Sequence, residues 1–378
     1  MKKVLALVVL AQVLQPQACG PSKSGPPDIG NQPVTNPFTT PDGIRLGVQT
    51  IVTNVEIPWS LAFAPDGRLF FTERPGRVRI YQNNQLLPAP ALTLEDVRHV
   101  GEGGLMGIAL HPQFATNRFV YLLYTANASG GMVNRLVRYR ETNNTLADRA
   151  VLLERMTANS VHNGGRIRFG PDGLLYLTMG DAANTSLSQT LSSLNGKILR
   201  VDENGIAAGG NPFGSEIWTW GHRNPQGLDW DPSNGDLWAT EHGASGNDEI
   251  NRLQPGRNYG WPVIEGAATR PDMETPAQFF SPSIAPSGGS FHNGSRIAGL
   301  RNNFFFGALT GQHIRRVILD AANPTRIAST ERWLNGEFGR IRDVVLGPDG
   351  ALYFCTNNRD GRGAAAASDD RIGRIIPQ

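Results

Sequence analysis

The sequence predicts an all-β fold, and within that class a six-bladed β-propeller of four-stranded antiparallel sheets over residues 43–378. Three observations support this prediction. A strand–turn–strand phrase recurs along the stretch, its copies are regularly spaced, and amphipathic helical windows are almost absent. A radial arrangement of small sheets suits such copies because it leaves only short, protected strand edges.

The recurring phrase is an apolar strand, a turn containing proline and usually Asp-Gly, and a second apolar strand. Proline presets the backbone for the first turn position, aspartate can bond nearby backbone groups, and glycine accepts positive φ, so each copy predicts a hairpin. The full copies are Leu61–Phe71, Ile108–Pro112 leading to Phe119–Tyr124, Ile167–Tyr176, Leu228–Trp238 and Val344–Tyr353.

The spacing of the copies gives the number of blades. The turn prolines stand at positions 65, 112, 171, 232 and 348, with gaps of 47, 59, 61 and 116 residues. The last gap is about twice the others, so we expect one degenerate copy there and assign it to Leu300–Leu309. A β-sandwich is the alternative, but it explains the turns without explaining their spacing.

A second phrase predicts an outer strand of the blades, in Gly76–Ile80, Gly196–Val201 and Gly373–Ile376. An N-terminal strand near Ile51–Val55 precedes the first full copy. We expect it to pair with a C-terminal strand, Arg371–Ile376, and so close the ring.

The N-terminus predicts export. Lys2 and Lys3 precede an apolar run, Val4–Leu14, that is too short to span a bilayer, so residues 1–19 are assigned to a signal peptide. Cys19 stands where a lipoprotein signal places its acylated cysteine, and both a lipid anchor and a plain signal peptide remain open. Residues 20–42, rich in Pro, Gly and Ser, predict a flexible linker, and the expected location is the bacterial periplasm or cell surface.

The composition favours a small-molecule partner. Net charge is +2, four of the 35 basic residues are lysines, and no basic run follows residue 3, which argues against nucleic acid or an anionic membrane. No transmembrane segment is expected. After the signal region Cys355 is the only cysteine, so no internal disulfide is expected, and no His or Cys cluster suggests zinc.

Polar residues flanking the repeated strands are the candidates for a site, because a propeller gathers these loops around its axis. His162 lies on a Gly-rich loop that enters a strand, and Asp181 follows the second strand of the same hairpin. Such a pair can orient a neutral imidazole so that its other nitrogen accepts a proton. A purely structural histidine is the alternative.

Six loops carry unusual polar and Gly-rich segments. They are Glu102–Gly107, His162–Arg166 with Gly180-Asp181, Gly221–Gly227, Asp248–Asn251 with Asn258–Trp261, Ala285–Gly288 and Arg340–Asp343. Together these segments resemble those of the soluble pyrroloquinoline quinone (PQQ)-dependent aldose sugar dehydrogenases, the glucose/sorbosone dehydrogenase-like family. They run in the family's order, and the resemblance extends over roughly residues 45–378.

The resemblance implies roles for several of these residues. His162 would be the general base and Asp181 its orienting partner. Four residues would hold the carboxylates of the cofactor PQQ, one of the last two also facing its reacting carbonyl: Arg223, Asn224, Arg340 and Arg342. Alternatively, Arg340 forms an ion pair with Asp343 or another acid.

The chain departs from the family pattern at two cofactor-binding positions. Thr310 stands in Leu309–Gln312, where relatives carry a lysine over the cofactor, and its hydroxyl could still donate a hydrogen bond. Glu102 occupies a pocket position where some relatives have glutamine, which changes the local charge.

The resemblance also implies calcium in two places. Backbone carbonyls of Gly243 and Ala244 would hold a Ca²⁺ that bridges protein and quinone, and Glu249 and Tyr259 would hold a structural Ca²⁺.

The implied activity is oxidation of an aldose sugar at its anomeric carbon to a lactone, with hydride transfer to PQQ. Electrons would then pass to an external acceptor, which could be a quinone, a cytochrome or a dye. Two alternatives stay open: a Ca²⁺-dependent lactonase-type propeller, and a noncatalytic exported propeller that binds carbohydrate or protein.

Overall fold

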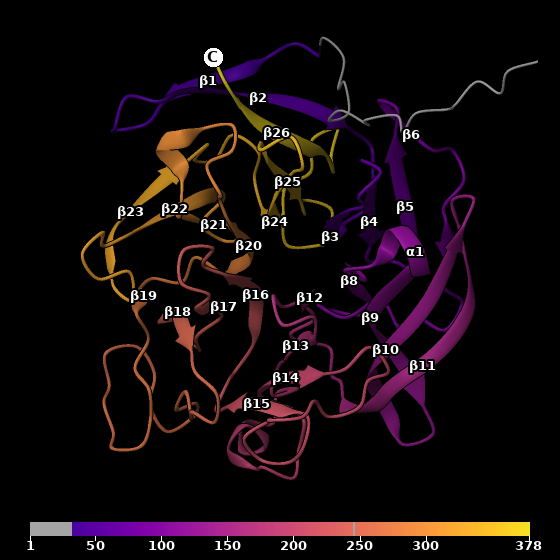
Figure 1. Cartoon of the computed structure of the whole chain (residues 1–378), viewed down its shortest axis with the longest axis vertical. Coiled ribbons are helices and arrows are strands. Elements are labelled where there is room, and N and C mark those ends of the chain that lie inside the picture. Colours follow the sequence, from indigo (N-terminus) through magenta and orange to yellow (C-terminus); the bar gives the residue numbers. More distant parts are fainter. Residues whose placement is uncertain (1–31, 245) are drawn as a thin grey trace, which may run out of the picture.

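The computed structural model describes residues 32–244 and 246–378, which form six antiparallel sheets around a central axis (Figure 1). Helix in this part is limited to α1 (Phe114–Asn117) and the 3-10 turns Thr185–Gln189 and Ala298–Leu300. The predicted six-bladed β-propeller is confirmed. The predicted signal peptide with Cys19, and residues 20–31 of the predicted linker, lie outside the described residues.

The first three sheets follow one another along the chain, each beginning at the axis. One holds β3 (Pro58–Phe63), β4 (Leu69–Glu73), β5 (Arg77–Gln82) and β6 (Gln85–Leu86), with β7 (Leu92–Thr93) also paired to β5. The next holds β8 (Leu105–Leu110), β9 (Phe119–Ala128), β10 (Gly131–Thr142) and β11 (Thr145–Thr157). The third holds β12 (Ile167–Phe169), β13 (Leu175–Met179), β14 (Lys197–Val201) and β15 (Ile217–Trp220).

The other three sheets complete the ring. They hold β16 (Pro225–Trp230), β17 (Leu237–Glu241), β18 (Asp248–Leu253) and β19 (Gln278–Phe280); then β20 (Pro286–Phe291), β21 (Phe304–Ala308), β22 (His313–Leu319) and β23 (Ile327–Trp333). The last is five-stranded, in the order β1 (Thr35–Thr39), β2 (Arg45–Val52), β26 (Ile372–Pro377), β25 (Leu352–Thr356) and β24 (Ile341–Leu346).

The core lies between neighbouring sheets. One apolar cluster, for example, joins Phe70 and Val78 of the β3–β6 sheet to Leu122 and Tyr124 of the β8–β11 sheet. The strands are too short to bury both faces alone, so each sheet gains most of its apolar burial from its two neighbours. No helix in the described part of the chain is both long and apolar enough to cross a membrane.

The degenerate blade begins earlier than the sequence indicates. Its hairpin runs from β20 to β21 and encloses a loop from 292 to 303, so Leu300–Leu309 contains the loop end and the second strand but not the strand at the axis. The inner strand escaped detection because it reads Pro-Ser-Gly-Gly-Ser-Phe, with one large apolar side chain.

Both ends of the domain meet in one sheet, as predicted (Figure 1). β2 pairs antiparallel with β26, with Val48 opposite Ile375, although the N-terminal strand ends at Val52 rather than extending to Val55. β1 adds one more strand outside β2. Residues 35–39, placed by the sequence in the linker, therefore belong to the propeller.

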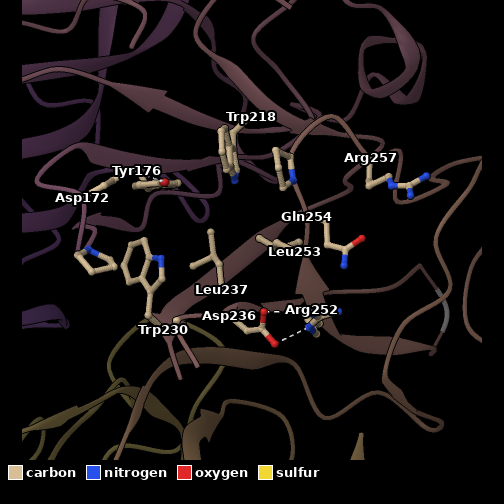
Figure 2. A pocket seen from close by; sticks show the side chains of 13 residues that line it. Asp172, Tyr176, Trp218, Trp230, Asp236, Leu237, Arg252, Leu253, Gln254 and Arg257 are labelled. Carbon is tan, nitrogen blue, oxygen red and sulfur yellow. Dashed lines mark hydrogen bonds and ion pairs between the residues drawn. The ribbon is translucent and has the colours of Figure 1, made fainter. Parts of the chain in front are cut away.

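The strands at the axis fix two opposite ends of the molecule. His162 and Asn224 precede β12 and β16, whereas the Pro171 turn and Trp230 lie at the other ends of these strands. At that second end a cleft opens between the β12–β15 and β16–β19 sheets, with Trp218 and Trp230 in its wall (Figure 2). The candidate site and the cleft are therefore separated by the length of the strands.

We predict that Ile375→Ala destabilises the domain because it opens a cavity in the closing sheet. Ile375 is fully buried between Val48 and Leu352. The free energy of unfolding, measured by denaturant titration, should fall by about 2–5 kcal/mol. Ile206 is 63% exposed, and Ile206→Ala should change it by less than about 0.5 kcal/mol. Equal effects of the two changes would contradict a closure that depends on this packing.

Candidate functional site

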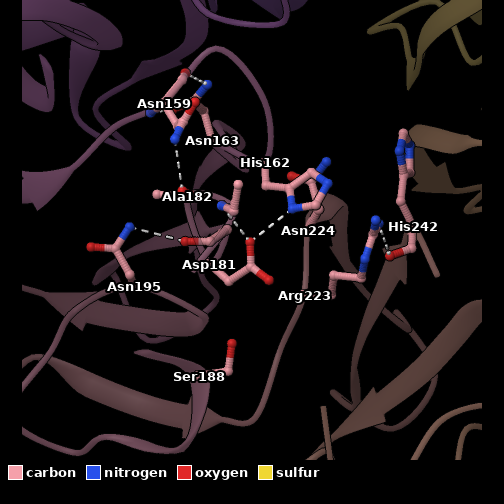
Figure 3. A network of polar contacts seen from close by, with 12 residues as sticks. Asn159, His162, Asn163, Asp181, Ala182, Ser188, Asn195, Arg223, Asn224 and His242 are labelled. Atoms are coloured by element: carbon pink, nitrogen blue, oxygen red, sulfur yellow. Dashed lines mark hydrogen bonds and ion pairs between the residues drawn. The ribbon is translucent and has the colours of Figure 1, made fainter. Parts of the chain in front are cut away.

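His162 and Asp181 lie together, as the sequence predicts. Nδ1 of His162 is 2.8 Å from Oδ1 of Asp181 (Figure 3). Asp181 is completely buried, whereas the His162 side chain is 18% exposed. A carboxylate only accepts hydrogen bonds, so Nδ1 carries a proton, and in the neutral imidazole Nε2 keeps a free lone pair. No side chain or backbone group in the described ranges is hydrogen bonded to Nε2.

Two glycines allow the loops that carry His162 and Asp181 to touch. A Cβ atom on Gly180 would lie 2.1 Å from the carbonyl oxygen of His162, and one on Gly164 would lie 2.4 Å from that of Thr178. Gly164 and His162 both have positive φ, +65° and +58°. The Gly-rich sequence around His162 is therefore required by close backbone approach.

Two amides and an indole hold the pair in place. Asn159 donates from Nδ2 to the carbonyl of Ala182 (3.1 Å), and Asn195 donates to that of Gly180 (3.0 Å) (Figure 3). Asp181 accepts a hydrogen bond from Trp261 Nε1 (2.9 Å), a residue from the neighbouring blade. Asp181 is thus fixed from two blades, and it can fix the imidazole in turn.

Glu102 and Asn224 adjoin the His162 loop. Oε2 of Glu102 accepts hydrogen bonds from the N–H of His162 (3.1 Å) and from Asn224 Nδ2 (3.4 Å), and Oε1 is 2.9 Å from Arg362 Nη1. Burial raises the pKa of Glu102, but His242, Arg362 and the His162 N–H outweigh it and lower the pKa to about 2. Glu102 is therefore an anion at neutral pH.

Arg223 directly precedes Asn224 and is held in place by contacts of its own. Its guanidinium lies over the Trp261 ring, 5.3 Å from the centroid. It also donates to the carbonyl of His242 (3.2 Å), as Figure 3 shows. Its backbone N–H donates to Glu241, whose other oxygen is 2.8 Å from Nδ1 of the buried His222. Both the side chain and the backbone of Arg223 therefore anchor the turn from Gly221 to Pro225.

Arg342 lies in β24, and Arg340 directly precedes this strand. Arg340 donates from Nε and Nη2 to Asp360 (3.0 and 2.9 Å), so the alternative of an acid partner holds for it, but with Asp360 and not Asp343. Arg342 donates to Gln226 Oε1 (2.5 Å). Burial, together with the positive charges of Arg340 and Arg74, lowers the pKa of Arg342 to about 9.

Three buried polar atoms in this region have no hydrogen-bond partner in the described protein: Nε of Arg223, Nε of Arg342 and Nε2 of His242. A buried polar atom without a partner is costly, by about 1–3 kcal/mol. Crowded cations and unpartnered N–H groups in one region favour a ligand that carries several anionic oxygens.

The calcium candidates lie beside this region, in two groups. No described N–H group donates to the carbonyl oxygens of Gly243 or Ala244, while the Gly243 N–H is bound to Asp248 Oδ1 (2.9 Å). Burial and the nearby charge of Glu241 raise the pKa of Glu249 to about 8. The Tyr259 hydroxyl already has two partners: it donates to the backbone carbonyl of Arg252 and accepts from the backbone N–H of Gln254. Across the described residues there is no group of three or more His, Cys, Asp or Glu side chains suited to a metal ion.

Thr310 is not brought into contact with the other candidates. It is exposed on the turn between β21 and β22, and its backbone N–H donates to Ile284 (3.1 Å). Asp248 connects this turn to the site indirectly, since its Oδ2 accepts from the N–H groups of Ile284 and Ala285 (2.6 and 2.7 Å).

Sequence reasoning missed Arg74, His242 and Arg362 as site residues. Arg74 and His242 directly follow β4 and β17, the second strands of their blades, in the position that Gly180-Asp181 takes after β13. A search for polar residues directly after the second strand of each copy would have found both. Arg362 lies on the loop between β25 and β26, and no repeat pattern marks it.

The fold and this site define a class: a six-bladed propeller with a carboxylate-oriented histidine and an arginine cluster at one end of its axis. The glucose/sorbosone dehydrogenase family model matches residues 55–365. Aldose sugar dehydrogenase YliI of Escherichia coli is 33% identical over 341 residues, covering 84% of this chain and 91% of that protein.

Two solved structures agree. A Thermus thermophilus protein described as a candidate oxidoreductase (glucose dehydrogenase) has a TM-score of 0.81 and 41% identity, covering 88% of this chain and all of that one. The PQQ-bound aldose sugar dehydrogenase of Streptomyces coelicolor has a TM-score of 0.81 and 34% identity, covering 91% of this chain and all of that one. The chain belongs to the glucose/sorbosone dehydrogenase family, and the resemblance seen in its sequence is confirmed.

We predict that Asp181→Asn changes the tautomer of His162. In the unaltered protein the neutral imidazole should be protonated at Nδ1, because Asp181 accepts there. In the variant both tautomers should be populated, as measured by the ¹⁵N chemical shifts of the ring nitrogens. Asp360→Asn, which alters a carboxylate bound to Arg340, is the matched control and should leave these shifts unchanged. An unchanged tautomer in Asp181→Asn would show that Asp181 does not orient the ring.

Proposed function

We propose that this protein is a PQQ- and calcium-dependent oxidoreductase that oxidises an aldose sugar at the anomeric carbon to a lactone and passes the electrons to an external acceptor. The observation that carries the proposal is the His162–Asp181 pair with its free Nε2, in a region where the buried Nε–H groups of Arg223 and Arg342 have no partner. Family membership and the activities named for the relatives from E. coli and S. coelicolor support it.

The residues present fit PQQ, which carries three carboxylates. Arg223 and Arg342 each keep a buried, unpartnered Nε–H, and Arg340 adds a third guanidinium whose Nη1 has no bond to Asp360. Carboxylates beside these cations would satisfy their N–H groups and offset the burial and the repulsion that together lower the pKa of Arg342. Asn224 supplies an amide at the same position, although its Oδ1 is bound to the Gly164 N–H (3.0 Å).

The residues also fit calcium in donor type. Gly243 and Ala244 offer main-chain carbonyl oxygens, and Glu249 offers a carboxylate near a second one, Glu241. A divalent cation would offset this crowding of negative charge. Tyr259 could contribute only its main-chain carbonyl, because its hydroxyl is occupied. Bound Ca²⁺ would act as a Lewis acid on the quinone carbonyl.

When bound, PQQ supplies an ortho-quinone that accepts two electrons and one hydrogen as hydride from the anomeric carbon. His162 Nε2 accepts the proton of the anomeric hydroxyl, so that this oxygen can become the lactone carbonyl. Asp181 holds the ring through Nδ1 and stabilises the imidazolium that results, while Trp261 keeps Asp181 in place. Asp181 is therefore a positioning residue and His162 a catalytic one.

The predicted export signal completes the proposal. It would place the enzyme in the periplasm or at the cell surface, with or without a lipid anchor at Cys19, where a quinone, a cytochrome or an added dye could receive the electrons.

We predict that His162→Gln removes most activity of the protein reconstituted with PQQ and Ca²⁺. The kcat for dye-linked aldose oxidation should fall by about 10²–10⁴, because the general base is lost. Quinone binding, followed by its absorbance, should persist, because the arginines remain. His111 lies at the far end of β8, and His111→Gln should leave kcat unchanged. Full turnover in His162→Gln would disprove the assigned role, and failure of the unaltered protein to bind PQQ would disprove the cofactor.

We predict that Glu102→Gln strengthens PQQ binding at neutral pH. Glu102 is charged there, and its anion repels the carboxylates of the cofactor and engages Arg362. Affinity should rise by about 3–10-fold, corresponding to about 1 kcal/mol. Glu203 is an exposed carboxylate near His111 at the far end, and Glu203→Gln should have no effect. Weaker or unchanged binding in Glu102→Gln, measured by calorimetry, would contradict this electrostatic role.

A further inference from the structure

A cleft of about 620 Å³ opens at the end of the propeller away from His162. Its wall carries the indoles of Trp218, at the far end of β15, and of Trp230, at the far end of β16 (Figure 2). Between them lies Leu237, and Tyr176 contacts both indoles edge-on, with ring centroids 5.9 and 5.0 Å away. Packing against Tyr176 fixes both tryptophans while leaving each partly exposed.

Several polar groups of this cleft have no partner. Nothing in the described part of the protein accepts a hydrogen bond from the indole N–H of Trp218 or Trp230. The Gln254 side-chain amide is likewise free, since only the backbone of that residue is bonded. By contrast, the other partly exposed indole in this region, Trp220, donates to Gly256 (3.3 Å). The cleft thus offers donors and an acceptor beside apolar ring surfaces.

The charges of the cleft are balanced. Arg252 forms two hydrogen bonds with Asp236 (2.6 and 2.9 Å), and Asp172 is bound by Arg200 (3.0 Å). Arg257 at the rim is paired with Glu274 (3.4 Å). A site for an anion would show an excess of cations, as the candidate catalytic site does, so this cleft suits a neutral ligand.

We propose that this cleft is a second binding site, separate from the catalytic one, and that it takes a neutral saccharide chain. The apolar C–H faces of pyranose rings would stack on the indoles of Trp218 and Trp230. Sugar hydroxyls, which both donate and accept, would bond the two indole N–H groups, the Gln254 amide and the oxygens of Asp236. The proposal does not rest on the redox activity, because it uses none of the residues around His162.

The saccharide is favoured over a protein partner by the chemistry of the lining. Paired aromatic rings with unpartnered donors and no net charge match the alternating C–H and hydroxyl surfaces of a sugar. Binding would hold the protein on a polysaccharide by one end while the opposite end of the axis stays open.

The test is calorimetric titration of the full protein with neutral tetrasaccharides, namely maltotetraose, cellotetraose and chitotetraose. At least one should bind saturably, with an affinity that high salt leaves unchanged. Trp218→Ala and Gln254→Ala should each weaken binding, the first by about tenfold or more. Phe279, on the edge strand β19, is an exposed aromatic residue outside the cleft, and Phe279→Ala should bind as the unaltered protein does.

Unfolding midpoints of the variants show whether the fold is retained. Trp218 lies on the outer strand β15, away from the axis. If Trp218→Ala is unstable, Gln254→Ala tests the cleft independently. Three results would overturn the proposal. These are no saturable binding of any tetrasaccharide, binding that is the same in both cleft variants as in the unaltered protein, and a concentration-dependent dimer that Trp218→Ala abolishes, which would identify the occupant as a second copy of the chain.

Discussion

The buried ion pair between Arg166 and Asp343 is the constraint on which the propeller and its site depend. Arg166 Nη1 donates to Asp343 Oδ2 (2.9 Å) and to Ser60 Oγ (2.8 Å), and its Nε donates to the carbonyl of Gln226 (3.1 Å). A Cβ on Gly288 would lie 2.0 Å from Asp343 and 2.2 Å from Arg166. The ion pair therefore contacts residues on the inner strands of four blades: β3, β16, β20 and β24. Arg166 itself directly precedes β12, the inner strand of a fifth blade. Because breaking a buried pair costs about 3–5 kcal/mol, the positions of these strands relative to one another along the propeller axis are strongly fixed.

The same ion pair explains why residues far apart in sequence form one site. His162 lies four residues before Arg166, Asn224 two before Gln226, and Arg342 next to Asp343. Each site residue is thus a short chain segment away from a group fixed at the axis. The cluster that results is costly without a ligand, since burial and mutual repulsion lower the pKa of Arg342. Stability is here reduced locally in favour of binding anionic oxygens.

The fold, the ring closure and the His162–Asp181 pair could be predicted because each has a local or periodic signal. The partners of the arginines could not. Glu337 and Asp343 each lie three residues from Arg340 in sequence, yet the partner is Asp360 on the loop after β25. Arg362 reaches the site only through the tertiary arrangement, because no repeat pattern marks its loop. The strand Thr35–Thr39 was assigned to a linker because its composition is polar, whereas its pairing with β2 is what orders it.

The meeting of β2 and β26 in one sheet has a consequence for biosynthesis. Gln49 and Arg374, 325 positions apart, are joined by a hydrogen bond of 2.8 Å. A ribosome must therefore complete nearly the whole chain before the ring can close, and the early blades wait with unpaired edges for that time. A chain that cannot close during translation remains accessible to the chaperones and translocases that handle unfolded polypeptides. Closure of the ring then becomes the last step of maturation, wherever in the cell it takes place.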